Sequence, residues 1–309
     1  MQPRIIFMGT PAFAVPALRA VHETYGVVAV VTIPDKPQGR GLEIRGSDVK
    51  IAAEQLGITR ILQPTSLKDE DFIKDVTSLE PDIMCVIAFR ILPRSVYTIP
   101  TLGAFNVHAS LLPKFRGAAP INHAIMRGEH ETGVTSFLLN DVVDTGNIIT
   151  QRSIVIGQHT TAGELYEALM PLAAVCAADT CRMLLTGTAV PMPQTPADPA
   201  FAAAPKVFRE TSGIDWEADV EVVRNFIRGL SPLPCAWTLW NDGLLKIYKA
   251  TASSVHCETG TWKITDNTLI AGAGNGALSL DEIQLPGKKR IAATEFLRGY
   301  RGAAEGSFA

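Results

Sequence analysis

Several features that would place a sequence in a class at once are absent from this one. It has no C-x-x-C pair, and its cysteines are odd in number and scattered, at Cys85, Cys176, Cys181, Cys235 and Cys257. Neither a disulfide framework nor a metal site is therefore expected. No long apolar run occurs, and the N-terminus lacks the apolar segment and cleavage site of a signal peptide. These absences favour a protein of the reducing cytoplasm that does not enter a membrane.

The chain is also poor in net charge. Its 28 Lys and Arg residues nearly balance its 31 Asp and Glu residues, which leaves a net charge of −3. Bulk attraction to nucleic acid is therefore not indicated, and any contact with RNA has to rely on local patches. With 47% hydrophobic and 19% charged residues over 309 positions, the composition indicates a globular protein with a substantial core, long enough for two domains.

The N-terminal part alternates between short apolar runs and helical patterns, which is typical of an α/β fold with a doubly wound, mostly parallel sheet. The turn at Gly9 to Pro11 is neither a G-x-G-x-x-G nor a Walker loop, so dinucleotide or ATP binding has little support. Ligands of such sheets bind beyond the carboxyl ends of the strands. The expected strands are 4–8, 27–33, 60–63, 83–89, one from 104, 134–139 and 148–156, and the expected helices are 12–25, 48–56, 67–79, 120–127 and 162–185.

Residues 188–205 are rich in Pro, Ala and Thr and have no hydrophobic period, so they are interpreted as a linker. They separate an α/β domain of residues 1–187 from a C-terminal domain of residues 206–309. The C-terminal part has a helix and then short strands separated by Gly and Asn turns, which favours a small, OB-like β-barrel. The stretch 272–276, GAGNG, is interpreted as a hairpin turn.

Chemistry-bearing residues gather in the stretch 104–121, AFNVHASLLPKFRGAAPI. Side chains alternate along a strand, so Asn106 and His108 project from the same face, about 7 Å apart. An amide and an imidazole side by side can both donate hydrogen bonds to an oxygen that becomes negative during a reaction. Taken alone, the pair is more simply explained by a capping asparagine and a satisfied histidine.

Asp144 lies in a turn sequence, Asp-Thr-Gly, between two expected strands. One explanation is a turn aspartate that bonds its own backbone. The alternative is a carboxylate that reaches His108 from a neighbouring loop, where it would orient the imidazole and favour its protonated form.

A long loop, residues 34–47, interrupts the early strands. It carries Lys36, Arg40 and Arg45 together with several glycines. A compact domain rarely keeps such a loop without a use, although a solvated surface loop is equally consistent with its composition. As a functional element it would be a mobile basic finger that contacts phosphate.

With these motifs in view, the sequence resembles the methionyl-tRNA formyltransferase family over nearly its whole length. The matching stretches are IIFMGTP at the start, DKPQGRG in the basic loop, FNVHASLLPKFRGAAPI, the Asp-Thr-Gly at Asp144, and IDW at Ile214 followed by SPLPCAW. The N-x-H, SLLP-x-x-RGAAPI and D-T-G set marks the wider group of enzymes that use 10-formyltetrahydrofolate. The basic loop and the C-terminal barrel favour the tRNA-directed members.

The resemblance implies transfer of the formyl group from 10-formyltetrahydrofolate to the α-amine of methionine on initiator Met-tRNA, for translation initiation. It implies a formyl-folate-binding catalytic domain at 1–187 and a tRNA-binding domain at 206–309. It also implies a cytoplasmic monomer that needs no metal.

The family's functional residues map onto this chain through its motifs. The family places Asn106, His108 and Asp144 in the catalytic centre, where the amide and the protonated imidazole stabilise the formyl oxygen and the carboxylate orients the imidazole. It places the SLLP segment against the folate and the basic loop at the end of the tRNA acceptor stem. The implied folate-binding residues are Ser110, Leu111, Leu112 and Pro113, and the implied tRNA-binding residues are Arg40, Lys36 and Arg45.

The chain departs from the family at Phe89-Arg90, where a Tyr-Gly pair is usual, and this change adds a cation near the folate segment. Its C-terminal part also counts as neutral, although that domain is often basic in relatives. Two alternatives stay open at this stage. One is a different formyl-folate enzyme, acting on a sugar nucleotide or a purine precursor or hydrolysing the folate. The other is a tRNA-binding module without catalytic activity, which the intact Asn106, His108 and Asp144 set disfavours.

Overall fold

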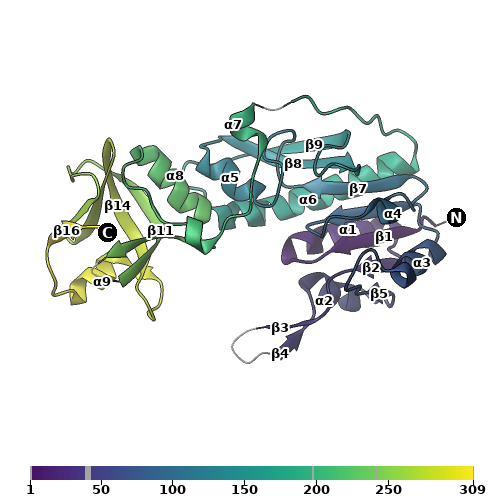
Figure 1. Ribbon diagram of the computed structural model, residues 1–309, viewed down its shortest axis with the longest axis horizontal. Coiled ribbons are helices and arrows are strands. Elements are labelled where there is room, and N and C mark those ends of the chain that lie inside the picture. Colours follow the sequence, from purple (N-terminus) through teal and green to yellow (C-terminus); the bar gives the residue numbers. More distant parts are fainter. Residues whose placement is uncertain (1, 39–42, 197, 241–242, 309) are drawn as a thin grey trace. The chain divides into compact units, whose positions relative to one another are not determined.

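The structure, a computed structural model, describes residues 2–38, 43–196, 198–240 and 243–308. Its chain forms two compact units (Figure 1). Unit 1 comprises Met1–Gly117, Thr132–Ile154 and Tyr166–Ala203, and unit 2 comprises Ala118–Glu131, Val155–Leu165 and Ala204–Ala309. Two short segments that precede the predicted linker, Ala118–Glu131 and Val155–Leu165, thus group with the C-terminal residues by compactness. The division into domains 1–187 and 206–309 with a linker at 188–205 stays a prediction.

Unit 1 is built on a sheet whose strands lie in the order β5-β2-β1-β6-β7-β8-β9. The pairs β1–β2, β2–β5, β1–β6 and β6–β7 are parallel, and β7–β8 is antiparallel. The sequence order reverses at β1, so the predicted doubly wound, mostly parallel sheet is confirmed. The strands are β1 (Ile5–Gly9), β2 (Ala29–Val31), β5 (Ile61–Leu62), β6 (Ile83–Ile87), β7 (Gly103–His108), β8 (Glu131–Leu138) and β9 (Ile148–Val155).

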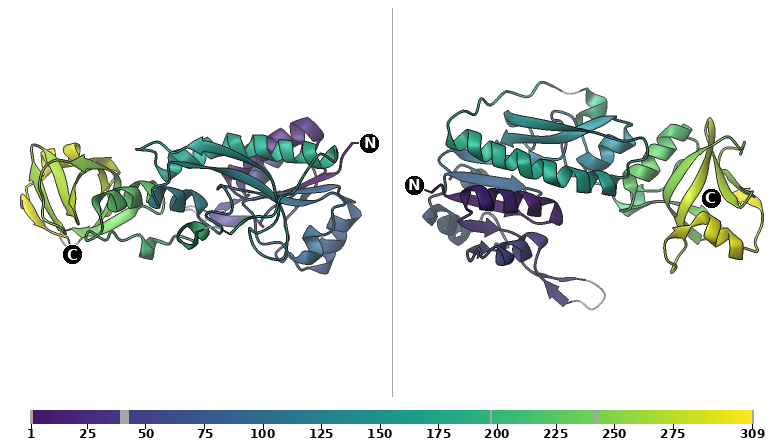
Figure 2. Two further views of the ribbon diagram at one scale, coloured as in Figure 1. Left: turned by 90° about the horizontal axis from the view of Figure 1, so that it is seen from above. Right: turned by 180° about the vertical axis from the view of Figure 1, so that it is seen from behind.

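Helices cover both faces of this sheet because successive strand side chains point to opposite sides (Figure 2). On one face, Ile6 of β1 packs in a core cluster with Phe72 of α3. On the other face, the Thr180 hydroxyl of α6 donates to Ser136 Oγ of β8 at 2.7 Å. The helices are α1 (Val15–Tyr25), α2 (Asp48–Gln55), α3 (Glu70–Ser78), α4 (Arg94–Tyr97), α6 (Ala162–Leu185) and α7 (Pro199–Ala202), with a short 3-10 helix, η1 (Ala12–Ala14), before α1.

Helix α6 is long and apolar enough to cross a membrane by length and composition, and it is the single such helix in the described part of the chain. The core helix of a globular protein passes the same test. This one buries Leu169, Ala173 and Cys181 completely, and its Asp179 pairs with Arg152 of β9. These contacts are those of a helix packed on a sheet, and the absence of a membrane role stays a prediction.

The basic loop at 34–47 contains a hairpin that its sequence does not reveal. Strands β3 (Lys36–Gln38) and β4 (Glu43–Arg45) pair antiparallel, with Lys36 directly opposite Arg45. In Figure 1 the hairpin projects away from the sheet of unit 1. Arg40 lies outside the described residues.

The base of the hairpin is fastened to unit 1 on both sides. The Asp35 carboxylate accepts hydrogen bonds from Lys50 Nζ at 2.6 Å and from Gln63 Nε2 at 2.7 Å. These bonds, that of Lys50 first, lower the pKa of Asp35. On the other side, Ser47 caps α2 by accepting from the Lys50 backbone N–H, and its hydroxyl bonds that of Thr32 at 2.6 Å. The hairpin therefore extends from a fixed base.

Unit 2 is built on a curled antiparallel sheet with the strand order β10-β11-β14-β13-β12-β16 and with β15 beside β14. No pairing joins β10 to β16 among the residues described here, so the curl is a half-barrel that confirms the predicted small C-terminal β-domain. The pair Ala273–Gly276 closes the predicted hairpin turn. The strands are β10 (Ala236–Trp240), β11 (Gly243–Ser253), β12 (Thr261–Thr265), β13 (Thr268–Ala273), β14 (Gly276–Gln284), β15 (Ile291–Ala292) and β16 (Glu305–Ser307).

An apolar core with an aromatic centre fills the curl of unit 2. Trp262 is 1% exposed and packs edge-on against Trp240, with 5.2 Å between the ring centroids. Helix α5 joins helix α8 through the Asn122 side-chain amide, which donates to the Gly229 carbonyl at 2.7 Å. The helices of this unit are α5 (Pro120–Met126), α8 (Val220–Leu230) and α9 (Ala293–Gly299), with the 3-10 helix η2 (Arg209–Thr211).

Candidate active site

Strand β7 carries the predicted amide and imidazole at its carboxyl end. In register, Asn106 lies opposite Phe137 of β8 and His108 lies opposite Thr135. Asn106 is half-buried, whereas His108 is 8% exposed. The structure thus places both residues on one strand, where a ligand of a doubly wound sheet is expected to bind.

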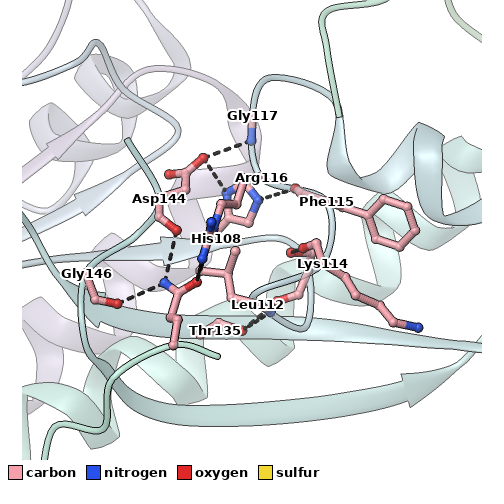
Figure 3. Close-up of polar contacts among 11 residues, drawn as sticks. His108, Leu112, Lys114, Phe115, Arg116, Gly117, Thr135, Asp144 and Gly146 are labelled. Carbon is pink, nitrogen blue, oxygen red and sulfur yellow. Dashed lines mark hydrogen bonds and ion pairs between the residues drawn. The ribbon is translucent and has the colours of Figure 1, made fainter. Parts of the chain in front are cut away.

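Two neighbours determine how the His108 ring is used (Figure 3). Its Nε2 lies 2.8 Å from the Phe115 carbonyl oxygen, and because a carbonyl can only accept, Nε2 carries a proton and donates it. Its Nδ1 lies 3.8 Å from Asp144 Oδ2, which is an ion-pair distance and too long for a direct hydrogen bond. The structure therefore brings Asp144 to His108, as the second explanation of the Asp-Thr-Gly turn required.

The Asp144 turn has a backbone that few sequences accept. Asp144 itself has a φ of +56°, in the left-handed region that aspartate tolerates better than most residues. Its Oδ2 accepts from the Gly117 N–H at 2.9 Å. A Cβ at Gly146 would lie 1.6 Å from the Leu138 carbonyl oxygen, so only glycine fits there. These constraints explain why a glycine lies two residues after the carboxylate.

The SLLP segment follows His108 directly and is tightly held. Ser110 is fully buried, and its hydroxyl donates to the Lys114 carbonyl at 2.6 Å. Leu112 is 3% exposed and packs in a cluster with Phe137. Leu111 and Pro113 are half-buried. The predicted folate-binding residues thus lie next to His108 in one well-packed loop.

Two polar residues that were not predicted from the sequence hold this segment in place. The buried Thr135 hydroxyl donates to the Ser110 carbonyl at 2.7 Å and accepts from the Leu112 N–H at 3.0 Å. The Gln151 side-chain amide donates to the Leu112 carbonyl at 2.8 Å and to Thr135 Oγ1 at 2.9 Å. A threonine within an apolar strand was the available signal for Thr135.

A third such residue lies in the segment predicted as a linker. Gln194 donates from Nε2 to the Asp144 carbonyl at 3.0 Å and to the Gly146 carbonyl at 2.8 Å. Its Oε1 accepts from Arg116 Nη2 at 2.6 Å and from Arg116 Nε at 3.2 Å. No pattern in the sequence distinguishes this glutamine.

The unusual Phe89-Arg90 pair follows the carboxyl end of β6. The Arg90 guanidinium donates to the Pro64 carbonyl at 2.8 Å and to the Thr65 carbonyl at 3.0 Å, and it lies 5.2 Å from the centroid of the Phe89 ring. Burial lowers the pKa of Arg90. The extra cation is thus bound to carbonyls of the loop after β5.

Lys36 and Arg45, the predicted tRNA-binding residues that the structure describes, are exposed on the β3–β4 hairpin. Within the described residues, no group of three or more His, Cys, Asp or Glu side chains is arranged to hold a metal ion.

Comparison with known proteins decides the family. Residues 3–175 match the family model described as formyl transferase, and residues 206–301 match the model described as formyl transferase, C-terminal domain. A methionyl-tRNA formyltransferase of Porphyromonas gingivalis is 43% identical over 309 residues, covering 96% of this chain and 95% of that protein. The chain belongs to the methionyl-tRNA formyltransferase family. A second family member, from Chlorobium luteolum, is 44% identical over 96% of this chain and 97% of its own.

Solved structures agree on the fold. A methionyl-tRNA formyltransferase from Clostridium thermocellum covers 83% of this chain and 96% of its own with a TM-score of 0.56 at 20% identity. A sugar 3N-formyl transferase, solved in the presence of dTDP and 5-N-formyl-THF, covers 94% of this chain and 100% of its own with a TM-score of 0.68 at 18% identity. At such identities these likenesses show the shared fold alone.

Membership of the methionyl-tRNA formyltransferase family confirms the predicted activity. The chain is a formyltransferase that uses formyl tetrahydrofolate as the formyl donor and methionyl-tRNA as the acceptor, in translation initiation. The alternative of a tRNA-binding module without catalytic activity is not supported.

Proposed function

We propose that Asn106, His108 and Asp144 form the catalytic centre of this enzyme, that the SLLP segment holds the formyl folate, and that the β3–β4 hairpin contacts the acceptor end of initiator Met-tRNA. The observation that carries the proposal is the His108 ring held between the Phe115 carbonyl and the Asp144 carboxylate.

The protein occupies Nε2 of His108, so Nδ1 is the ring atom left for the substrate. Nδ1 donates when it carries a proton, and the ring is then an imidazolium whose charge lies 3.8 Å from the Asp144 carboxylate. At that separation the Nδ1–H makes no direct hydrogen bond to the carboxylate and is left to donate to a substrate oxygen, while the carboxylate offsets the charge of the ring. The formyl oxygen becomes negative when the methionine amine attacks the formyl carbon, and Nδ1–H stabilises it.

Asn106 supplies the second donor from the same strand. Its side-chain amide is half-buried and lies on the same face of β7 as His108. A preorganised donor of this kind contributes about 2.7–4 kcal/mol to stabilising an oxyanion. Asp144 orients His108 and accepts the proton that the attacking amine releases, directly or through water. When the intermediate collapses, the bond between the formyl carbon and N10 of the folate breaks and the proton passes to N10, so that tetrahydrofolate leaves and the formyl group stays on the methionine amine.

Ser110, Leu111, Leu112 and Pro113 are suited to hold a folate because they are ordered before it binds. Hydrogen bonds from Thr135 and Gln151 fix the backbone of the segment. A loop held in one conformation loses little entropy on binding a ligand.

The hairpin is suited to hold RNA because of its charges. Lys36 and Arg45 lie directly opposite each other, and like charges in that position repel. A phosphate group between them would offset the repulsion. Arg40 belongs to the same stretch of chain, and we include it in the tRNA-binding set on the family resemblance.

We further propose a cytoplasmic monomer that does not act at a membrane and requires no metal. The free, buried cysteines Cys85, Cys176, Cys181, Cys235 and Cys257 support a reducing compartment. We also propose that residues 1–187 and 206–309 act as the catalytic and tRNA-binding domains.

The test is a formyl-transfer assay with 10-formyltetrahydrofolate that offers either Met-tRNA or an amino-sugar nucleotide as acceptor. We expect transfer to Met-tRNA alone. Asp144→Asn keeps the shape of the side chain and tolerates the same backbone conformation, and it should lower kcat at least about a hundredfold. Parent-like kcat in this variant would remove Asp144 from the proposed catalytic centre.

A further inference from the structure

The side-chain amide of Gln194 ties two active-site loops together. Its two N–H groups donate to the carbonyls of Asp144 and Gly146, and its oxygen accepts from two N–H groups of Arg116. A primary amide has two donors and two acceptor lone pairs, so every hydrogen-bonding position of this one is used. Gln194 thus joins the turn that holds Asp144 to the loop that follows the SLLP segment.

Other contacts from the same stretch of chain reach that loop. The Phe201 carbonyl accepts from the Phe115 N–H at 2.7 Å, and the Ala202 carbonyl accepts from the Arg116 N–H at 3.1 Å. The Phe201 ring meets the Phe115 ring edge-on at 6.0 Å between centroids. Phe115 is the residue whose carbonyl binds His108. The stretch containing Gln194 therefore contacts both residues that flank the His108 ring.

The Asp144 backbone needs such support. A non-glycine residue at a φ of +56° is strained and persists only where its surroundings determine it. The Gly117 N–H binds the Asp144 carboxylate, while Gln194 binds the Asp144 carbonyl, so the side chain and the main chain of one residue are held from two sides.

We propose that Gln194 is a positioning residue that acts through Asp144, holding the carboxylate at its distance from His108. The inference rests on the proposed role of Asp144 in catalysis. In this role Gln194 contacts no reacting atom. Its effect on the reaction comes from the two carbonyls it fixes.

The N–H donors of the Gln194 amide allow a positioning role to be distinguished experimentally from a general packing role. In Gln194→Glu the carboxylate keeps its pairing with Arg116 but has no N–H to donate, and it places negative charge against the carbonyls of Asp144 and Gly146. The glutamate variant should therefore preserve the fold and lose the positioning. Gln194→Ala loses both sets of bonds.

The experiment measures kcat and KM for Met-tRNA formylation in both variants, with circular dichroism as a check on folding. We expect kcat to fall about tenfold to a hundredfold, the scale of a small misplacement of a catalytic group. The KM for 10-formyltetrahydrofolate should stay within about threefold of the parent value. Gln55→Glu is the matched control, because Gln55 Oε1 accepts from Arg19 at 2.9 Å in the same unit, and it should leave kcat unchanged.

A double-mutant cycle identifies the route of the effect. In the Asp144→Asn background, Gln194→Ala should change kcat by less than about threefold, because the group it positions is already disabled. Parent-like kcat in Gln194→Glu, or losses that multiply independently in the cycle, would overturn the inference. Parent-like kcat in Asp144→Asn alone would instead refute the proposed role of Asp144.

Discussion

Replacing Thr135 by valine tests how the folate-binding segment is held. The Thr135 side chain is fully buried. Its hydroxyl donates to the Ser110 carbonyl at 2.7 Å and accepts from the Leu112 N–H at 3.0 Å and from Gln151 Nε2 at 2.9 Å. Valine has nearly the same shape as threonine, so the change removes these bonds without opening a cavity.

The magnitude follows from the groups that lose a partner. Gln151 keeps its bond to the Leu112 carbonyl, but the Ser110 carbonyl and the Leu112 N–H each lose the Thr135 hydroxyl. A buried polar group without a partner costs about 1–3 kcal/mol, so two such groups should lower the free energy of unfolding by about 2–6 kcal/mol. The corresponding fall in Tm is on the order of 10 °C. The KM for formyl folate should rise, because the segment is no longer fixed before binding.

Thr132→Val is the matched control on the same strand. Thr132 is 2% exposed, and its hydroxyl has no hydrogen-bond partner among the described residues, so its removal should leave stability unchanged or raise it. Unfolding should be followed by circular dichroism, because the tryptophans Trp216, Trp237, Trp240 and Trp262 all lie in unit 2 and their fluorescence does not report on unit 1. Equal melting of the two variants, or a Thr135→Val variant as stable as the parent, would show that the Thr135 hydroxyl does not stabilise the segment.

Three further predictions concern the proposed catalytic centre and the hairpin. Asn106→Ala should lower kcat about a hundredfold or more with formyl-folate binding intact, measured by single turnover and titration; an unchanged rate would exclude the amide from catalysis. Combining Lys36→Ala with Arg45→Ala should raise the KM for Met-tRNA. The slope of the logarithm of tRNA affinity against the logarithm of salt concentration should become shallower by about one unit for each lost phosphate contact. An identical slope would speak against an RNA contact. Hydrogen bonds, chiefly from Lys50, lower the pKa of Asp35 in the folded protein. Their contribution to the stability of the hairpin base is therefore complete above the unfolded-state pKa of about 3.9, and it is lost as the pH falls through the folded-state pKa of Asp35. Amide hydrogen exchange in β3 and β4 should therefore become faster, beyond its intrinsic pH dependence, at the pH where Asp35 takes up a proton. The Asp35→Asn variant should show no such increase at that pH.

The hydrophobic pattern of the sequence predicted most of the helices and strands, because each kind of element repeats its buried positions with its own period. The apolar runs of β1 and β6 are buried on both faces, as central parallel strands are, and α6 spans the range that its composition indicated. The β3–β4 hairpin was not predicted, because β3 has three residues and one of them is Pro37, which cannot donate a hydrogen bond to a neighbouring strand. Helix α3 begins at Glu70, after the predicted start at 67, because the Asp69 side chain caps its first N–H groups.

Strand geometry alone is enough to put Asn106 and His108 on one face, because side chains alternate along a strand with a period of two. The Asp-Thr-Gly sequence also indicated a turn at Asp144, because Asp and Gly are favoured in turns. Which distant groups meet them depends on the tertiary fold, because it alone brings Asp144 beside His108 and Gln194 to the Asp144 carbonyl. Hydrogen bonds between a side chain and the backbone of a loop far along the chain leave no period in the sequence. They exist only once packing has brought the two segments within about 3 Å of each other.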